Sequence, residues 1–194
     1  YKNIFAERAF SLGYYNYANA IMTKEEVKTI AKKMKDGEKK WGILQSEVYN
    51  DGIREAVMME GFSDFVNACQ RRRILLSIVS HKSRRNIHDP LQRNLQEPAL
   101  EWMKNHHFFD KSGFGFSLKQ VFFAETIEDK VARIKTLNCS HFVDDLMKVL
   151  LHPLFPESTR KILYYKCPSN RDNKDVDYLG DWHSITNYII TGKK

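Results

Sequence analysis

Four short apolar runs, separated by segments of helical periodicity, constrain what this chain can fold into more than any other feature. The run at residues 74–79 is nearly continuous, which is typical of a strand that is covered on both faces of a parallel sheet. Three more runs of this kind lie at residues 121–123, 141–143 and 162–165, and helical patterns at about 97–107, 126–137 and 145–151 separate them. The alternation predicts an α/β fold whose parallel strands form one sheet with helices on both faces.

The first 57 residues have a different character, with helical patterns and no alternating strand pattern. Thr23 and Glu26 have the spacing of a capping box, and apolar residues recur behind them at helical intervals. We therefore expect residues 1–57 to form a helical lobe and residues 58–194 to form the α/β core. Residues 168–181 are polar and predict an exposed loop, which precedes a final helix.

Composition and charge narrow the possible partners and the compartment. No apolar run approaches the roughly 18 residues of a membrane-spanning helix. Cys69, Cys139 and Cys167 show neither close pairing nor metal-ligand spacing, which predicts free thiols in a reducing cytoplasm. The net charge of +7 is spread along the chain, so it favours small phosphorylated substrates over nucleic acid, which needs clustered cations and aromatic platforms. The oligomeric state stays open.

Polar side chains follow two of the apolar runs, at the points where the predicted strands end. Ser80, His81 and Lys82 follow the first run, and Asp144 and Asp145 follow the third. Because ligands bind at the carboxyl ends of parallel strands, we expect these side chains to share one edge of the sheet. Carboxylates offer the hard oxygen ligands that Mg²⁺ prefers, and a lysine or a hydroxyl can hold phosphoryl oxygens.

Lys130 stands out on the predicted helix at about 126–137, because it falls within the apolar stripe that Ile127 and Ile134 define. A lysine on a buried face needs an anionic partner or a solvated cleft. The alternative is a lysine at the edge of the stripe whose stem packs while its amine reaches water. The aspartate pair also has an alternative, since Asp145 could simply cap the next helix.

The ordered pattern of Ser80, Lys130 and the pair Asp144-Asp145 resembles the signature of the haloacid dehalogenase (HAD) superfamily of hydrolases. The resemblance covers roughly residues 58–166, and local stretches resemble a bacterial subgroup of HAD-like hydrolases. It implies a HAD-like, Rossmann-like core with a small helical cap. It also implies Mg²⁺-dependent hydrolysis or transfer of a phosphomonoester through an aspartyl-phosphate.

The resemblance also implies a role for each matching residue. Ser80, with His81 and Lys82 beside it, would bind the phosphoryl oxygens, and Lys130 would neutralise the phosphate and the nucleophile. Asp144, together with Asp145, would help to hold Mg²⁺. The catalytic set implied within this chain is therefore Ser80, Lys130 and Asp144.

One part of the family pattern is missing from the chain. The family's nucleophile and acid/base are two aspartates of an Asp-x-Asp segment that ends the central strand, and no apolar run here ends in that way. Residues 175–177 have the sequence Asp-Val-Asp, which matches the pattern, but they lie in the predicted loop. We expect the missing segment immediately upstream of Tyr1 and expect residues 1–194 alone to be inactive. The alternatives are a non-catalytic HAD-like binding module and a phosphatase acting on nucleic-acid ends, whose activity would fall steeply with salt.

Overall fold

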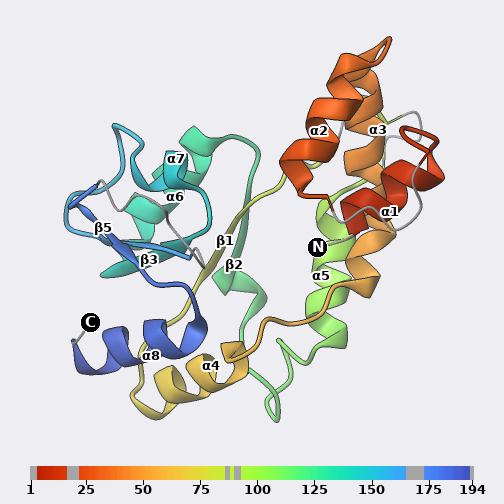
Figure 1. Ribbon diagram of the computed structural model, residues 1–194. Coiled ribbons are helices and arrows are strands. Elements are labelled where there is room, and N and C mark those ends of the chain that lie inside the picture. Colours follow the sequence, from red (N-terminus) through yellow and green to blue (C-terminus); the bar gives the residue numbers. More distant parts are fainter. Residues whose placement is uncertain (1–3, 17–21, 86–87, 90–92, 165–172, 193–194) are drawn as a thin grey trace. The chain divides into compact units, whose positions relative to one another are not determined.

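The computed structural model describes residues 4–16, 22–85, 88–89, 93–164 and 173–192 (Figure 1). The chain divides into two compact units, one formed by residues 1–57 and 83–106 and the other by residues 58–82 and 107–194. The boundary at 57/58 lies where the sequence pattern changes. Residues 83–106 group with the helices, although the sequence analysis placed them in the α/β core.

The helical unit owes its core to helices whose apolar faces meet. Its elements are α1 (Ile4–Ser11), α2 (Lys24–Lys33), α3 (Gly37–Asn50), η1 (Gly52–Glu55) and α5 (Gln96–Asn105). The expected capping box is confirmed at the start of α2, where the side chains of Thr23 and Glu26 each bond the other's backbone N–H. Ala9, Val27 and Leu44 are buried where α1, α2 and α3 meet. The described part of residues 1–57 holds no strand, as expected.

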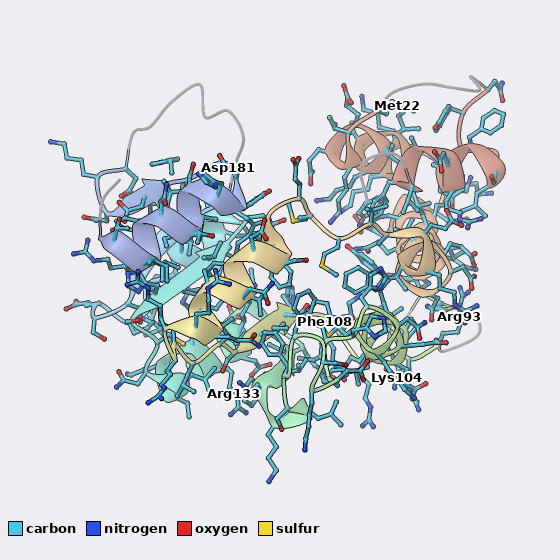
Figure 2. The ribbon with its side chains drawn as sticks, turned by 90° about the horizontal axis from the view of Figure 1, so that it is seen from below. Met22, Arg93, Lys104, Phe108, Arg133 and Asp181 are labelled. Carbon is cyan, nitrogen blue, oxygen red and sulfur yellow. The ribbon has the colours of Figure 1, made fainter. Side chains whose placement is uncertain are left out.

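A polar network explains why residues 83–106 belong to the helical unit. The guanidinium of Arg93, labelled in Figure 2, lies 2.9 Å from the carboxylate of Asp89 and 2.8 Å from that of Glu47 on α3. Asp89 is buried, so its charge requires such a partner. The indole N–H of Trp102 on α5 donates to the carbonyl of Ala56 at 2.8 Å. The contacts of Arg93 with Glu47 and of Trp102 with Ala56 join segments far apart in sequence, which hydrophobic periodicity alone does not reveal.

The second unit is α/β, as predicted, and all of its paired strands are parallel. Its strands are β1 (Ile78–His81), β2 (Val121–Ala124), β3 (His141–Asp144), β4 (Arg160–Leu163) and β5 (Val176–Tyr178). Its helices are α4 (Phe62–Arg71), η2 (Leu118–Gln120), α6 (Ile127–Leu137), α7 (Met147–Leu150) and α8 (Trp182–Thr191). No described helix of the chain has the length and apolar character to cross a membrane.

The expectation of a single sheet is wrong for the described residues. β1 and β2 form one sheet, β3, β4 and β5 form another, and no ladder joins the two (Figure 1). The first strand spans residues 78–81 and not 74–79, and Leu75 in the expected strand is 92% exposed. The predicted loop at 168–181 contains β5, because the N–H and C=O groups of this short segment pair with β4.

Helices cover both faces of the three-stranded sheet. On one face, Tyr188 of α8 packs edge-on against His141 of β3 and accepts a hydrogen bond from Arg160 of β4. On the other face, Phe142 of β3 shares a buried cluster with Ile134 of α6. Val79 of β1 belongs to the same cluster. The two sheets therefore share one hydrophobic core through α6, although they share no hydrogen bonds among the described residues.

Candidate functional site

A buried ion pair between α6 and β3 is the centre of the candidate site. Lys130 lies in the first turn of α6, and its Nζ atom is 2.5 Å from Oδ2 of Asp144, the last residue of β3. The side chains are 9% and 2% exposed, so both charges are almost fully removed from water. Lys130 thus has the anionic partner that a lysine on a buried face needs, and its amine does not reach bulk water.

Each carboxylate oxygen of Asp144 has a partner, and the surroundings of the carboxyl shift its pKa in opposite directions. Its Oδ1 atom accepts a hydrogen bond of 2.9 Å from the backbone N–H of Leu146. Burial raises the pKa of the Asp144 carboxyl, while the Lys130 ammonium and the Leu146 N–H act in the opposite direction. Asp145 is exposed and does not cap α7, whose N-cap residue is Leu146 and which has no side-chain cap among the described residues, so the capping alternative is wrong for Asp145.

The ion pair also fixes the relative direction of the two sheets. α6 follows the carboxyl end of β2, and its first turn carries Lys130. Because Lys130 contacts Asp144 at the carboxyl end of β3, the carboxyl ends of β2 and β3 lie on the same side of the unit. β1 is parallel to β2, with Ser80 opposite Phe123. The sequence-predicted residues of β1 and β3 therefore share one side of the unit, where ligands bind in parallel sheets.

Ser80 and His81 lie at the carboxyl end of β1 but take no part in the ion pair. Ser80 is half-buried, and no hydrogen bond joins its hydroxyl to Lys130 or Asp144 in the described part of the chain. His81 is exposed, and its Nε2 atom lies 3.0 Å from the backbone oxygen of Glu125, which follows β2. The structure thus brings Lys130 and Asp144 together and leaves Ser80 and His81 outside their contact.

Lys82 is the second lysine at this edge whose charge is removed from water. Its backbone N–H donates to the carbonyl of Ala124 at 2.9 Å and extends the β1–β2 pairing by one step. Its Nζ atom is buried. Burial lowers the pKa of the Lys82 amine from its ordinary value of 10.5 to about 8.

The described residues do not form a magnesium site by themselves. No group of three or more His, Cys, Asp or Glu side chains among them is arranged to hold a metal ion. Both carboxylate oxygens of Asp144 have partners, and Asp145 is exposed. Mg²⁺ requires near-octahedral oxygen ligands, so Asp144 and Asp145 would need further carboxylates beside them.

The sequence analysis gave no role to a hollow of about 370 Å³ beside β2. The hollow is lined by residues of β2 and the polar face of α6, and the guanidinium of Arg133 lies 4.6 Å from the centre of the Phe122 ring. Figure 2 labels Arg133. The sequence places Arg133 outside the apolar stripe of α6, but it does not predict the contact of Arg133 with Phe122 of β2. Neither Lys130 nor Asp144 lines this hollow, so we place the candidate site at the ion pair.

Comparison with known proteins identified no relative of this chain. The chain matches no family model, and neither the curated proteins nor the solved structures include a significant match. The argument for function therefore depends on the chain's own residues.

Proposed function

We propose that the α/β unit is the core of a HAD-like hydrolase that cleaves small phosphomonoesters, or transfers their phosphoryl group. The observation that carries this proposal is the buried Lys130–Asp144 pair at the carboxyl side of parallel strands. The order of Ser80, Lys130 and Asp144 along the chain, each on the element where the resemblance requires it, supports the same conclusion. The helical unit would then serve as the cap.

Each residue of the chain has a physical role in this proposal. The Lys130 ammonium offsets the negative charge of a bound phosphoryl group and of an attacking carboxylate, in a site where low dielectric strengthens the interaction. Ser80 donates a hydrogen bond to a phosphoryl oxygen, and Lys82 adds a second positive charge. Asp144 orients Lys130. Together with Asp145 and further carboxylates, it would hold Mg²⁺, which would offset charge on the phosphate.

In this proposal the nucleophile is an aspartate of an Asp-x-Asp segment that ends a strand, which none of the described strands does. An aspartate carboxylate attacks phosphorus, the ester P–O bond breaks, and the leaving oxygen takes a proton from the second aspartate of the Asp-x-Asp segment. Water then attacks the aspartyl-phosphate and releases inorganic phosphate. These two aspartates would also add the carboxylates that a magnesium site needs beside Asp144. Residues 1–194 alone should hydrolyse no phosphomonoester.

A second candidate function is a non-catalytic HAD-like module that binds a ligand or a partner. The observation that favours it is the engagement of both Asp144 oxygens by Lys130 and Leu146, which leaves the described residues without a metal site. The two candidates differ in one respect that can be measured. Only the hydrolase gains activity when an Asp-x-Asp strand is present.

Hydrolysis of an aryl phosphate with Mg²⁺, by a polypeptide that carries such a strand ahead of Tyr1, tests the proposal. Lys130→Met keeps the length of the side chain and removes its charge, and it should slow turnover by a factor on the order of 10². Lys135→Met changes an exposed lysine of the same helix and should leave the rate unchanged. Circular dichroism of each variant checks the fold. Equal rates for the two folded variants would contradict the role of Lys130.

A further inference from the structure

The outer edge of β2 carries backbone groups that no other described residue pairs with. In the described part of the chain β2 pairs with β1 alone, and the Ala124 carbonyl accepts from the Lys82 N–H on that side. Successive residues of a strand direct their backbone groups to opposite edges, so Phe123 directs its N–H and C=O away from β1. Val121 has the same direction, although its N–H donates to the Leu118 carbonyl. Both groups of Phe123 and the carbonyl of Val121 are therefore available to another strand.

This edge lacks most of the features that keep an edge strand from pairing. Such strands are commonly protected by shortness, by a proline or a charge within the strand, or by a bulge. β2 is short, but its sequence Val-Phe-Phe-Ala contains neither a charge nor a proline, and its register with β1 has no bulge. Leu118, just before the strand, is 64% exposed. An open apolar edge of this kind favours pairing with a further strand.

Opposite charges flank β2 at equal distances from its centre. Lys119 lies three residues before Phe122, and Glu125 lies three residues after it. Both flanking side chains are exposed. If two copies of β2 pair antiparallel about Phe122, Lys119 of each copy lies opposite Glu125 of the other. Opposite charges across a strand pair stabilise it and like charges destabilise it, so the edge is complementary to a second copy of itself.

The direction of the backbone groups agrees with this register. A second copy must place its own edge-facing residues, Val121 and Phe123, opposite those of the first. A pairing centred on Phe122 does so, because Val121 of each copy lies opposite Phe123 of the other. The Phe123 N–H of each copy then donates to the Val121 carbonyl of the other. Registers centred on Val121 or on Phe123 meet the same condition, but they place Lys119 opposite an uncharged residue.

The hollow beside β2 gives the side chains of a second strand a place to pack. It is lined by β2 and by one face of α6, which carries Asp129, Ala132, Arg133 and Thr136 at helical spacing. Opposite residues of an antiparallel pair point to the same face, so Phe122 of the second copy would lie beside Phe122 of the first. On that face Arg133, labelled in Figure 2, lies over the Phe122 ring. A second ring there would gain aromatic and cation–π contacts.

We propose that the outer edge of β2 is a homodimerisation surface, at which two copies of this chain pair antiparallel about Phe122 and join their two-stranded sheets into one. The arrangement has twofold symmetry, so both copies use the same surface and the assembly closes as a dimer. Neither Lys130 nor Asp144 lines the hollow, so the dimer does not depend on the proposed function.

Sedimentation equilibrium of residues 1–194 measures the dimer, over about 10 µM to 1 mM because small interfaces are weak. Lys119→Glu sets like charges opposite each other at two symmetric positions and should weaken the dimer about tenfold. Glu125→Lys should weaken it equally. The controls Lys135→Glu and Glu157→Lys make the same charge changes at other exposed positions of the α/β unit and should leave the dissociation constant unchanged.

Restoring the opposite charges tests the register. The double variant Lys119→Glu/Glu125→Lys exchanges the two charges and should dimerise as tightly as the unchanged chain. An equimolar mixture of the two single variants should form a mixed dimer about tenfold tighter than either variant forms alone, because opposite charges meet again at both positions. A double variant that dimerises as weakly as the single variants would overturn the antiparallel pairing about Phe122.

A backbone variant tests the hydrogen bonds across the edge. Phe123→Pro removes the N–H that donates to the second copy and should abolish the dimer, because proline is tolerated on an edge strand but cannot donate. Phe123→Ala removes the same ring, keeps the N–H and should still dimerise. Circular dichroism and thermal melts check that both variants fold. Equal dimerisation of the two folded variants, a monomeric unchanged chain at about 1 mM, or association beyond the dimer would overturn the proposal.

Discussion

The two sheets of the α/β unit are built from similar apolar runs but are covered very differently. In β4, Ile162 is fully buried and Leu163 is 5% exposed. In β1 only Val79 is buried, and Leu75 just before the strand is 92% exposed. The difference shows that similar apolar runs can be buried to very different extents, so that an apolar run alone does not predict how well its strand is covered. Among the described residues, β4 of the three-stranded sheet is therefore better covered than β1 of the two-stranded sheet.

The largest effect is expected where the better-covered sheet meets α6. Asp144→Asn leaves the Lys130 ammonium buried without its charged partner, so it should destabilise the protein by about 3–5 kcal/mol. Chemical denaturation measures this loss. Asp145→Asn changes an exposed carboxylate one residue away and should stay within about 0.5 kcal/mol.

A double variant sharpens this prediction. Adding Lys130→Met to Asp144→Asn removes the uncompensated charge and should recover most of the lost stability, which would appear as a strong coupling in a double-mutant cycle. Additive losses would show that the two side chains are not coupled as their distance indicates.

The next largest effect is expected when the same substitution, isoleucine to alanine, is made in each of the two sheets. Ile162→Ala in β4 removes a fully buried side chain and should cost about 2–5 kcal/mol. Ile78→Ala in β1 removes a half-buried side chain and should cost clearly less in residues 1–194. Urea denaturation measures both losses of stability, and equal losses in the two variants would contradict the difference in coverage.

The smallest expected effect concerns the charge of Lys82. The pKa of its amine falls from 10.5 to about 8 on folding, so the unfolded chain binds more protons between these values. The cost of burying the charge is present at pH 7 and disappears as the pH rises through this interval. Lys82→Met should therefore stabilise the protein at pH 7 by about 1–2 kcal/mol, and the gain should shrink between pH 8 and 10.5.

Denaturation at several pH values measures the gain at Lys82. The control is Lys119→Met, which changes an exposed lysine of the same unit and should have a small effect that is constant with pH. If the difference between the two variants does not change with pH, the Lys82 amine is not buried in its charged form.

Much of the fold was predictable, because it depends on local periodicity. The helical character of residues 1–57, α6 and the parallel strands β2 and β3 all follow from the spacing of apolar residues. β5 was missed because three residues with one buried side chain, Val176, give little signal against a polar background. The grouping of residues 83–106 with the helices depends on the Arg93 network, and such long-range contacts leave no periodic trace.

The candidate site was predictable in part for the same reason. The position of Lys130 in an apolar stripe showed that it needed a partner, and the carboxylate after β3 was the natural choice. That Asp144 rather than Asp145 meets Lys130 follows from the pleat, because Phe142 and Asp144 point to the α6 face. The split between β1 and β3 was not predictable from the individual runs, since each run reports its own strand and not its neighbours.

The central proposal is that Lys130 and Asp144 belong to a phosphoryl-transfer site whose nucleophile is an aspartate of an Asp-x-Asp strand. Mass spectrometry after acid quenching of a polypeptide that carries an Asp-x-Asp strand, mixed with Mg²⁺ and an aryl phosphate, tests it most directly. The account predicts one added phosphoryl group, on the first aspartate of the supplied strand, and none on residues 1–194 alone. A phosphoryl group on Asp144, or hydrolysis by residues 1–194 alone, would contradict it.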